Sequence, residues 1–251
     1  DAAGVAYVTG ATNSSVVGFP TTPDGFKTTK TGGHYDSFLL QIDPAQSGAA
    51  SLVYGTLIGG ELSNENITSL NGGVAVDTSG AVYVTGQTQS DDFPVTAGAL
   101  KTVRESSDAF VIKIDPSQPT ASQIVYSTFL GGSAGDEGYD IAVDDSGRAY
   151  VTGLTTNSFP TTPCAFQLTG TNSVDAFLAV LDATGSQLEY GSFIGGPSDL
   201  ADIGYGVAVD PNGDAYIAGQ AGSGFPTTPG SVQTVFGNGF LDAFVAKIPH
   251  E

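Results

Sequence analysis

A hairpin that returns at regular intervals constrains this chain more than any other feature of its sequence. Its clearest copy, GYDIAVDDSGRAYVTG, spans residues 138–153. The apolar run at 141–143 is typical of a strand covered on both faces by neighbouring sheets. Asp144 and Gly147 then favour a tight turn, because Asp bonds the backbone ahead of it and Gly tolerates a positive φ. The aromatic and β-branched residues at 150–152 fit a second strand. The segment therefore predicts two short strands joined by a D-x-x-G turn.

This hairpin alternates with a second one. The first returns as GGVAVDTSGAVYVTG, ending at Gly86, and as YGVAVDPNGDAYIAG, ending at Gly219. Its tyrosines are spaced by 76, 67 and 66 residues and are Tyr7, Tyr83, Tyr150 and Tyr216. The second hairpin opens on Asp-Ser-Phe or Asp-Ala-Phe and closes on strands such as IVYSTFLGG. Its opening aspartates are Asp36, Asp108, Asp175 and Asp242. Each period thus predicts four antiparallel strands.

A proline-rich loop separates the hairpins in each period. It reads FPTTP at 19–23, 159–163 and 225–229, and FPVTA at 93–97. Four antiparallel strands per period are typical of a β-propeller blade, whose faces are buried by the neighbouring blades. The segments resemble the SBBP family of β-propeller repeats, in which GIAVD-x-x-G-x-x-YVTG, FPTTPGAFQ and DAFVAKLD-type segments recur. The resemblance covers nearly the whole chain and implies an all-β propeller of four-stranded antiparallel blades.

The repeat also sets the expected domain organisation. We expect one β-propeller domain over residues 1–251, with about four repeats of roughly 67 residues. The approximate copies are 1–72, 73–139, 140–205 and 206–251. The chain opens at the turn of a hairpin and stops after the third strand of its last copy, so both terminal blades should be incomplete. The expected strand count is three, four, four and three. A start at Asp1 without Met is expected of a processed product or an excised segment.

Three arrangements are compatible with incomplete terminal blades. The chain could form a four-bladed ring with one thin blade, it could be a slice of a longer propeller, or subunits could share strands in a dimer or filament. We expect strand sharing or continuation, because a bare strand edge promotes aggregation.

Composition narrows the function classes. Seven basic and 26 acidic residues give a net charge of −19, which disfavours binding to nucleic acid. The charge is typical of a solvated extracellular surface, with cation binding or a high-salt habitat as alternatives. No apolar run has the length of a membrane span, so we expect no membrane insertion. The single cysteine, Cys164, excludes an internal disulfide, as is common in secreted bacterial or archaeal proteins.

Acidic residues recur after the Gly-Gly pairs and are candidate calcium ligands, because Ca²⁺ prefers oxygen donors. They are Glu61 and Glu65, Asp136 and Glu137, and Asp199 and Asp202. Their spacing matches no EF-hand, and the D-x-N-x-D run at 210–214 lacks the rest of a calcium loop. Solvated loops are the alternative interpretation. Apart from calcium, we expect no cofactor.

Other polar residues have structural or peripheral interpretations. The aspartates before Phe recur once per blade, which favours a buried, loop-tethering role over catalysis. Asn13 and Asn66 lie in N-x-S/T sequons and are candidate glycosylation sites. His34 and His250 sit in no recognisable Ser-His-Asp or metal pattern.

These features lead to a ranked set of functional hypotheses. The first is a non-enzymatic extracellular or cell-surface propeller with a structural, adhesion or assembly role. Its partners would be further copies of itself, as an oligomer or filament, or other surface proteins and glycans. The second is a lectin-like propeller that binds carbohydrate or peptide. The third, a lyase or hydrolase, lacks a non-repeated cluster of candidate catalytic residues.

Overall fold

The computed structural model describes residues 1, 3–13, 18–30, 35–60, 72–171, 174–237 and 239–250. Within these ranges the chain forms strands and two short 3₁₀ helices. They are β1 (Ala6–Thr12), β2 (Asp36–Ile42), η1 (Gly48–Ser51), β3 (Leu52–Ile58), β4 (Val74–Val76), β5 (Val82–Thr88), β6 (Asp108–Ile114), η2 (Thr120–Ser122), β7 (Ile124–Leu130), β8 (Asp136–Val143), β9 (Ala149–Thr155), β10 (Asp175–Leu181), β11 (Leu188–Ile194), β12 (Ile203–Val209), β13 (Ala215–Ala221) and β14 (Asp242–Ile248).

The strands form four antiparallel sheets, in each of which neighbours in the chain are neighbours in space. We name them sheet I (β1-β2-β3), sheet II (β4-β5-β6-β7), sheet III (β8-β9-β10-β11) and sheet IV (β12-β13-β14). The predicted count of three, four, four and three strands is therefore confirmed in the described ranges. Sheets III and IV begin at Asp136 and Ile203, a few residues before the copy boundaries expected at 140 and 206. A bulge in each first strand accounts for this, because it carries the strand past the apolar run visible in the sequence.

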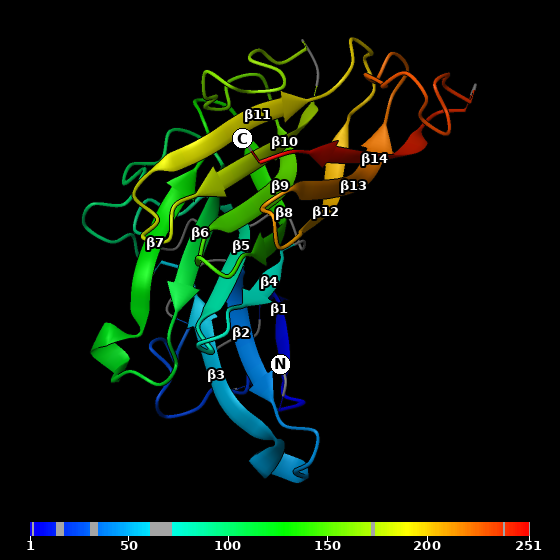
Figure 1. The fold of residues 1–251 in the computed structure, drawn as a ribbon. Coiled ribbons are helices and arrows are strands. Elements are labelled where there is room, and N and C mark those ends of the chain that lie inside the picture. Colours follow the sequence, from blue (N-terminus) through cyan, green and yellow to red (C-terminus); the bar gives the residue numbers. More distant parts are fainter. Residues whose placement is uncertain are drawn as a thin grey trace.

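Consecutive sheets pack face to face, and each junction has its own apolar core. Leu39 of sheet I meets Phe110 and Ile112 of sheet II in one cluster. A second cluster joins sheets II and III, and a third joins sheets III and IV. Figure 1 shows the four sheets fanned in chain order, from β1–β3 at one end to β12–β14 at the other. Each sheet is thus buried by its neighbours in the fan.

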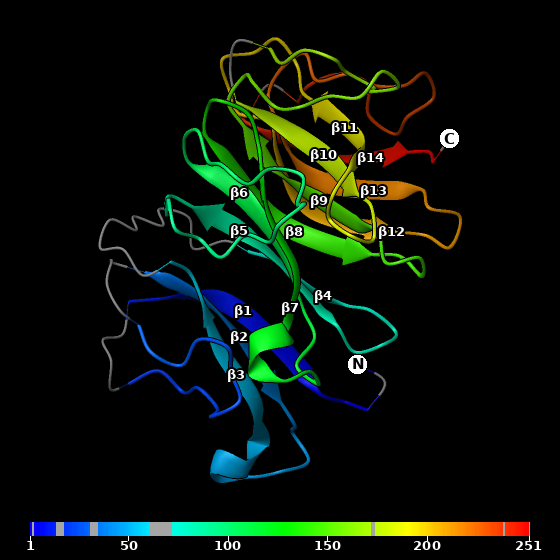
Figure 2. The same ribbon diagram turned by 90° about the vertical axis from the view of Figure 1, so that its left-hand side faces the viewer.

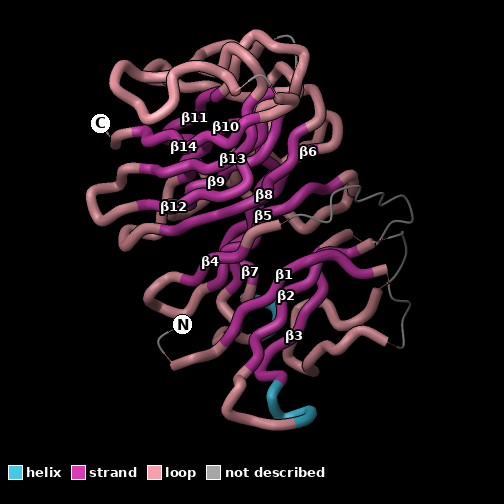
Figure 3. The backbone as a smooth tube through the Cα atoms, turned by 90° about the vertical axis from the view of Figure 1, so that its right-hand side faces the viewer, coloured by secondary structure: helices cyan, strands magenta, loops and turns pink. Residues whose placement is uncertain are grey.

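The fan is open. Sheets I and IV lie at opposite ends in all three ribbon and tube views (Figures 1, 2 and 3). The all-β class and the antiparallel sheets match the expectation, but the described residues do not close a four-bladed ring. Closure of these sheets into a propeller stays a prediction.

The proline-rich loops lie against the sheets through their phenylalanines. Phe93 packs against Phe110 in a tilted arrangement with ring centroids 4.7 Å apart, and Phe159 stacks on Phe177 at 4.3 Å. The pair Phe225 and Phe244 repeats the contact at 4.4 Å. Each loop is therefore anchored on the face of its sheet that meets the preceding sheet. In the described ranges, no helix combines the length and apolarity that a membrane crossing requires.

Candidate functional site

An open groove lies between sheets III and IV. It has a volume of about 1210 Å³ and lies between strands β10–β11 and strand β14, with the loop at 222–236 beside it. We call it the β14 groove. Its apolar walls include Leu178, Val180, Tyr190 and Ile194 from sheet III, and Phe225, Phe244, Ala246 and Ile248 from sheet IV and its loop.

One edge of the groove is an unoccupied strand edge. β14 pairs with β13 on one side, from Asp242 opposite Ala221 to Ile248 opposite Ala215. In sheets I, II and III the strand equivalent to β14 pairs on both sides. In the part of the chain that the structure describes, no strand pairs with the outer edge of β14. Its outward N–H and C=O groups are therefore available for another strand.

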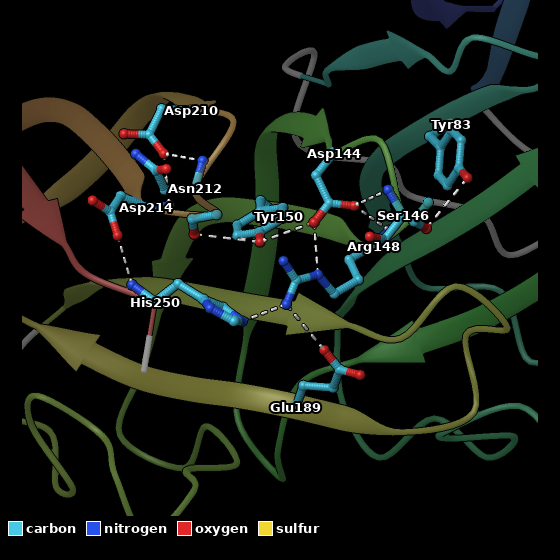
Figure 4. Close-up of polar contacts among 12 residues, drawn as sticks. Tyr83, Asp144, Ser146, Arg148, Tyr150, Glu189, Asp210, Asn212, Asp214 and His250 are labelled. Atoms are coloured by element: carbon cyan, nitrogen blue, oxygen red, sulfur yellow. Dashed lines mark hydrogen bonds and ion pairs between the residues drawn. The ribbon is translucent and has the colours of Figure 1, made fainter.

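A polar cluster that includes Arg148, Glu189 and His250 lines part of the groove (Figure 4). The Arg148 Nε donates to Asp144 Oδ2 at 2.6 Å, and its guanidinium lies 3.8 Å from Glu189 on β11. The same guanidinium contacts His250, whose backbone N–H donates to Asp214. The cluster thus links the turn of sheet III, the outer strand β11 and the segment after β14.

Two opposing effects set the protonation of the ion pair in this cluster. Burial favours the neutral acid, but hydrogen bonds from the backbone and side chain of Arg148 outweigh it and lower the pKa of Asp144. Burial also opposes the charge of Arg148, yet its bond to Asp144 raises the pKa of the guanidinium. Burial further raises the pKa of the neighbouring Tyr150 to about 12, so its hydroxyl remains a neutral donor. The pair is charged and the tyrosine is neutral at ordinary pH.

Most of this chemistry recurs along the chain. In every sheet the aspartate of the D-x-x-G turn accepts a bond from the tyrosine six residues later, at 3.0 to 3.2 Å. A cation also lies over three of these rings: Lys113 over Tyr83, Arg148 over Tyr150, and Lys247 over Tyr216. A device repeated in this way supports the fold. What distinguishes the β14 groove is its open apolar cleft beside a free strand edge.

The aspartates before Phe lie where the proline-rich loops meet their sheets. Asp36, Asp108 and Asp175 are fully buried, and Asp242 is half-buried. Each contacts its loop, through Lys27 (3.2 Å), Lys101 (2.8 Å), the Thr171 N–H (2.7 Å) and the Gly237 N–H (2.7 Å) respectively. These contacts give all four the geometry of loop tethers.

The candidate calcium ligands have other contacts. Asp136 and Asp202 are buried and accept backbone N–H bonds from Gly132 and Gly196, both at about 2.7–2.8 Å. Glu137 bonds the side chains of Gln87 and Tyr139, and Asp199 is exposed.

The described residues do not gather three or more His, Cys, Asp or Glu side chains as a metal site would. Calcium binding stays a prediction, and Glu61 and Glu65 lie outside the described residues. In the D-x-N-x-D run, Asp210 accepts the N–H groups of Asn212 and Asp214, so this carboxylate shapes its own turn.

The remaining candidate residues lie in loops, after the last strand or outside the described residues. Asn13 is exposed just after β1, whereas Asn66 and His34 lie outside the described residues. Cys164 is a free, exposed thiol in its loop. His250 reaches the β14 groove, a position its sequence context did not reveal. The groove itself had one signal in the sequence: the closing-strand pattern occurs at residues 52–60, 124–132 and 188–196, so among the described residues none is left to pair with β14.

Comparison with known families gives a direct finding. The profile of SBBP, described as a beta-propeller repeat, matches residues 53–94, 125–160 and 192–226. Each match starts within the last strand of one sheet and continues through the first two strands of the next. A repeat with these family-model boundaries spans the junction between two consecutive sheets. No curated protein matches the chain.

Proposed function

Because the chain carries three SBBP β-propeller repeats, we propose that it is a non-enzymatic structural module that assembles with further sheets of its own kind. The proposal includes an extracellular or cell-surface setting and an adhesion or scaffold role. The acidic net charge of −19 and the exposed sequon residue Asn13 are in keeping with that setting.

One observation carries the proposal: sheet IV has an uncovered apolar face. Leu39, Val111 and Leu178 occupy the same position in sheets I to III and are at most 1 % exposed. Each is covered by the following sheet. Val245 takes this position in sheet IV and is 78 % exposed. Covering a valine fully is worth about 1.5–3 kcal/mol, so this face favours a partner sheet.

Sheet I offers the complementary face. Phe38, Leu40 and Ile42 are only half-buried, whereas Phe110, Ile112 and Ile114 are fully buried at the equivalent positions of sheet II. The Val245 face of sheet IV and the Phe38 face of sheet I therefore correspond to the two different faces that meet at each internal junction. A contact between them is head-to-tail, which generates a ring or a filament.

The repetition of the polar groups supports a non-enzymatic role. Catalysis needs one assembled site, whereas the tethering aspartates and the Asp–Tyr–cation devices recur from sheet to sheet. Such recurrence is expected of groups that hold each repeat together.

The test is the oligomeric state of the chain and two matched variants. Copies carrying a charge of −19 repel one another, so the measurement is made at physiological and at higher salt, where repulsion is screened. We expect light scattering to show mass rising with concentration, and electron micrographs to show rings or filaments. Val245→Asp should leave monomers, while Val103→Asp, at a loop valine that is 71 % exposed, should assemble like the wild type.

Two outcomes would remove the proposal. One is a monomer at every concentration and salt level. The other is assembly of Val245→Asp at the wild-type level, because the uncovered face of sheet IV would then not be the contact.

A further inference from the structure

We propose that the β14 groove is an acceptor site for one extended peptide strand, which adds to sheet IV as its fourth strand. The ligand has the pattern of this chain's own closing strands: Leu or Ile, any residue, Tyr, Gly or Ser, Ser or Thr, Leu or Phe, Ile or Leu, then Gly-Gly. The inference deepens the proposed function, on which it rests, by naming the segment that completes the last sheet.

The register of the three complete pairings defines where the strand would lie. In sheet III, Phe177 lies opposite Phe193, and Leu178 lies opposite Ser192. Sheets I and II pair the same positions, and all three pairings carry an irregularity one residue before the end. β14 has matching residues, with Phe244 equivalent to Phe177. By this register, a strand that pairs with the free edge of β14 would place a Phe or Leu opposite Phe244.

Aromatic packing shows what is missing from the groove. In sheet II, Phe93 contacts both Phe110 and Phe129, with ring centroids 4.7 and 5.8 Å apart. In sheet III, Phe159 contacts Phe177 and Phe193 in the same way, at 4.3 and 6.3 Å.

Among the described residues of sheet IV, the loop phenylalanine has the first of these partners and no second ring. Phe225 stacks on Phe244, and both side chains line the groove. Phe93 and Phe159 are buried, whereas Phe225 is half-buried. The sixth residue of the incoming strand would complete this cluster.

The opposite wall of the groove is incomplete in the same way. Tyr54 and Tyr126, on β3 and β7, are at most 2 % exposed because the following sheet covers them. Tyr190 is their equivalent on β11 and is half-buried beside the groove. A strand seated on β14 would bury Tyr190, as sheet II buries Tyr54 and sheet III buries Tyr126 at the other junctions.

The strand must come from outside the three closing strands of the same molecule. β3, β7 and β11 are already paired in their own sheets. Each family match begins within such a strand, so the missing element corresponds to the opening strand of a further SBBP repeat. Addition of an extended strand gives main-chain hydrogen bonds along the edge, and alternate side chains enter the groove.

The experiment uses the whole chain and a labelled peptide with the sequence of residues 187–196, QLEYGSFIGG. We expect saturable binding by fluorescence anisotropy, together with slower amide exchange in β14. A peptide with Ala in place of its Phe should bind about tenfold or more weakly, because it loses a buried aromatic ring. This comparison requires no change to the protein.

Two protein variants locate the site and separate it from the end face of sheet IV. Ala246 packs in the apolar cluster between sheets III and IV together with Phe244 and Ile248, whereas Ala243 alternates with these residues along β14, is exposed and is absent from that cluster. Ala246→Glu should therefore abolish peptide binding and Ala243→Glu should retain it. Val245→Asp, which tests assembly, should bind the peptide like the wild type. Circular dichroism checks that each variant is folded.

Three results would overturn the inference. They are no saturable binding, equal binding of the Phe-to-Ala peptide, and slower exchange in strands other than β14. Failure of assembly alone, with peptide binding intact, would count against the proposed function and leave this site standing.

Discussion

At the scale of single residues, the buried carboxylates are the most informative groups. Asp136 is fully buried, and one of its oxygens accepts the Gly132 N–H at 2.8 Å. Burial, reinforced by the nearby carboxylate of Asp108, raises the pKa of Asp136 to about 6. Near neutral pH, the buried negative charge of Asp136 therefore destabilises the fold, although the same carboxylate holds the Gly-Gly loop through the Gly132 N–H.

This shift predicts a pH dependence of stability. The folded chain holds the Asp136 proton more tightly than the unfolded chain, so the stability from this group is full below about pH 4 and is lost as pH rises through about 6. The contribution of Asp136 to the free energy of unfolding that is lost over this pH range is on the order of 3 kcal/mol. Urea unfolding from pH 4 to 8 should show a weaker pH dependence in Asp136→Asn than in the wild type. Exposed Asp199→Asn is the control, and an unchanged slope in Asp136→Asn would contradict the assignment.

At the scale of elements, each first strand of sheets III and IV bulges toward its partner. The pairing of β8 with β9 shifts between Gly138 and Asp140, and β12 shifts in the same way. A Cβ at Gly153 would lie 1.8 Å from the Glu137 carbonyl oxygen, and one at Gly219 would lie 1.9 Å from that of Ile203. In sheets III and IV, the glycine that ends the Tyr-x-x-Gly motif is thus required by a close backbone approach.

Gly153→Ala should therefore destabilise the chain strongly. The clash is with backbone, which cannot rotate away, so we expect a loss of about 3 kcal/mol or more in the free energy of unfolding. Gly135→Ala is the matched control, because its Cβ would make an ordinary contact of 3.6 Å with Thr156. Chemical denaturation of both variants checks the prediction. Equal losses would show that the bulge does not set the requirement.

At the scale of the whole molecule, nearly identical strands have unequal surroundings. β6 and β10 are paired on both edges and covered on both faces, whereas the described residues pair one edge and cover one face of β14. In a linear array of repeats each sheet is stabilised by its neighbours, so the ends open more readily than the centre.

Hydrogen exchange should reveal this gradient. We expect amides of β14 that bond to β13 to exchange at least tenfold faster than their equivalents in β10 that bond to β9, because local opening costs less at the end. Exchange measured by NMR at low protein concentration checks this without assembly. Equal protection of β10 and β14 would mean that the fan opens only as one unit.

Much of the architecture was predictable because its signals are local. The D-x-x-G turns, the short apolar runs before them and the Tyr-x-x-Gly strands lie within a few residues of one another, and they placed the strands and their 3-4-4-3 grouping. The aspartates before Phe were readable as tethers because their recurrence is itself a sequence feature. The bulges were not readable, because the extra strand residues 136–140 are largely polar.

Local sequence specifies the strands and turns of every repeat, whereas the differences between repeats come from the sheets that pack against them. Asp108 and Asp242 begin almost the same strand, DAFV, yet one is fully buried and the other half-buried. The open groove, the uncovered Val245 and the unpaired edge of β14 all arise from the neighbour that a sheet has or lacks. Burial depends on contacts between residues of different sheets, and these contacts cannot be predicted from a local pattern of residues.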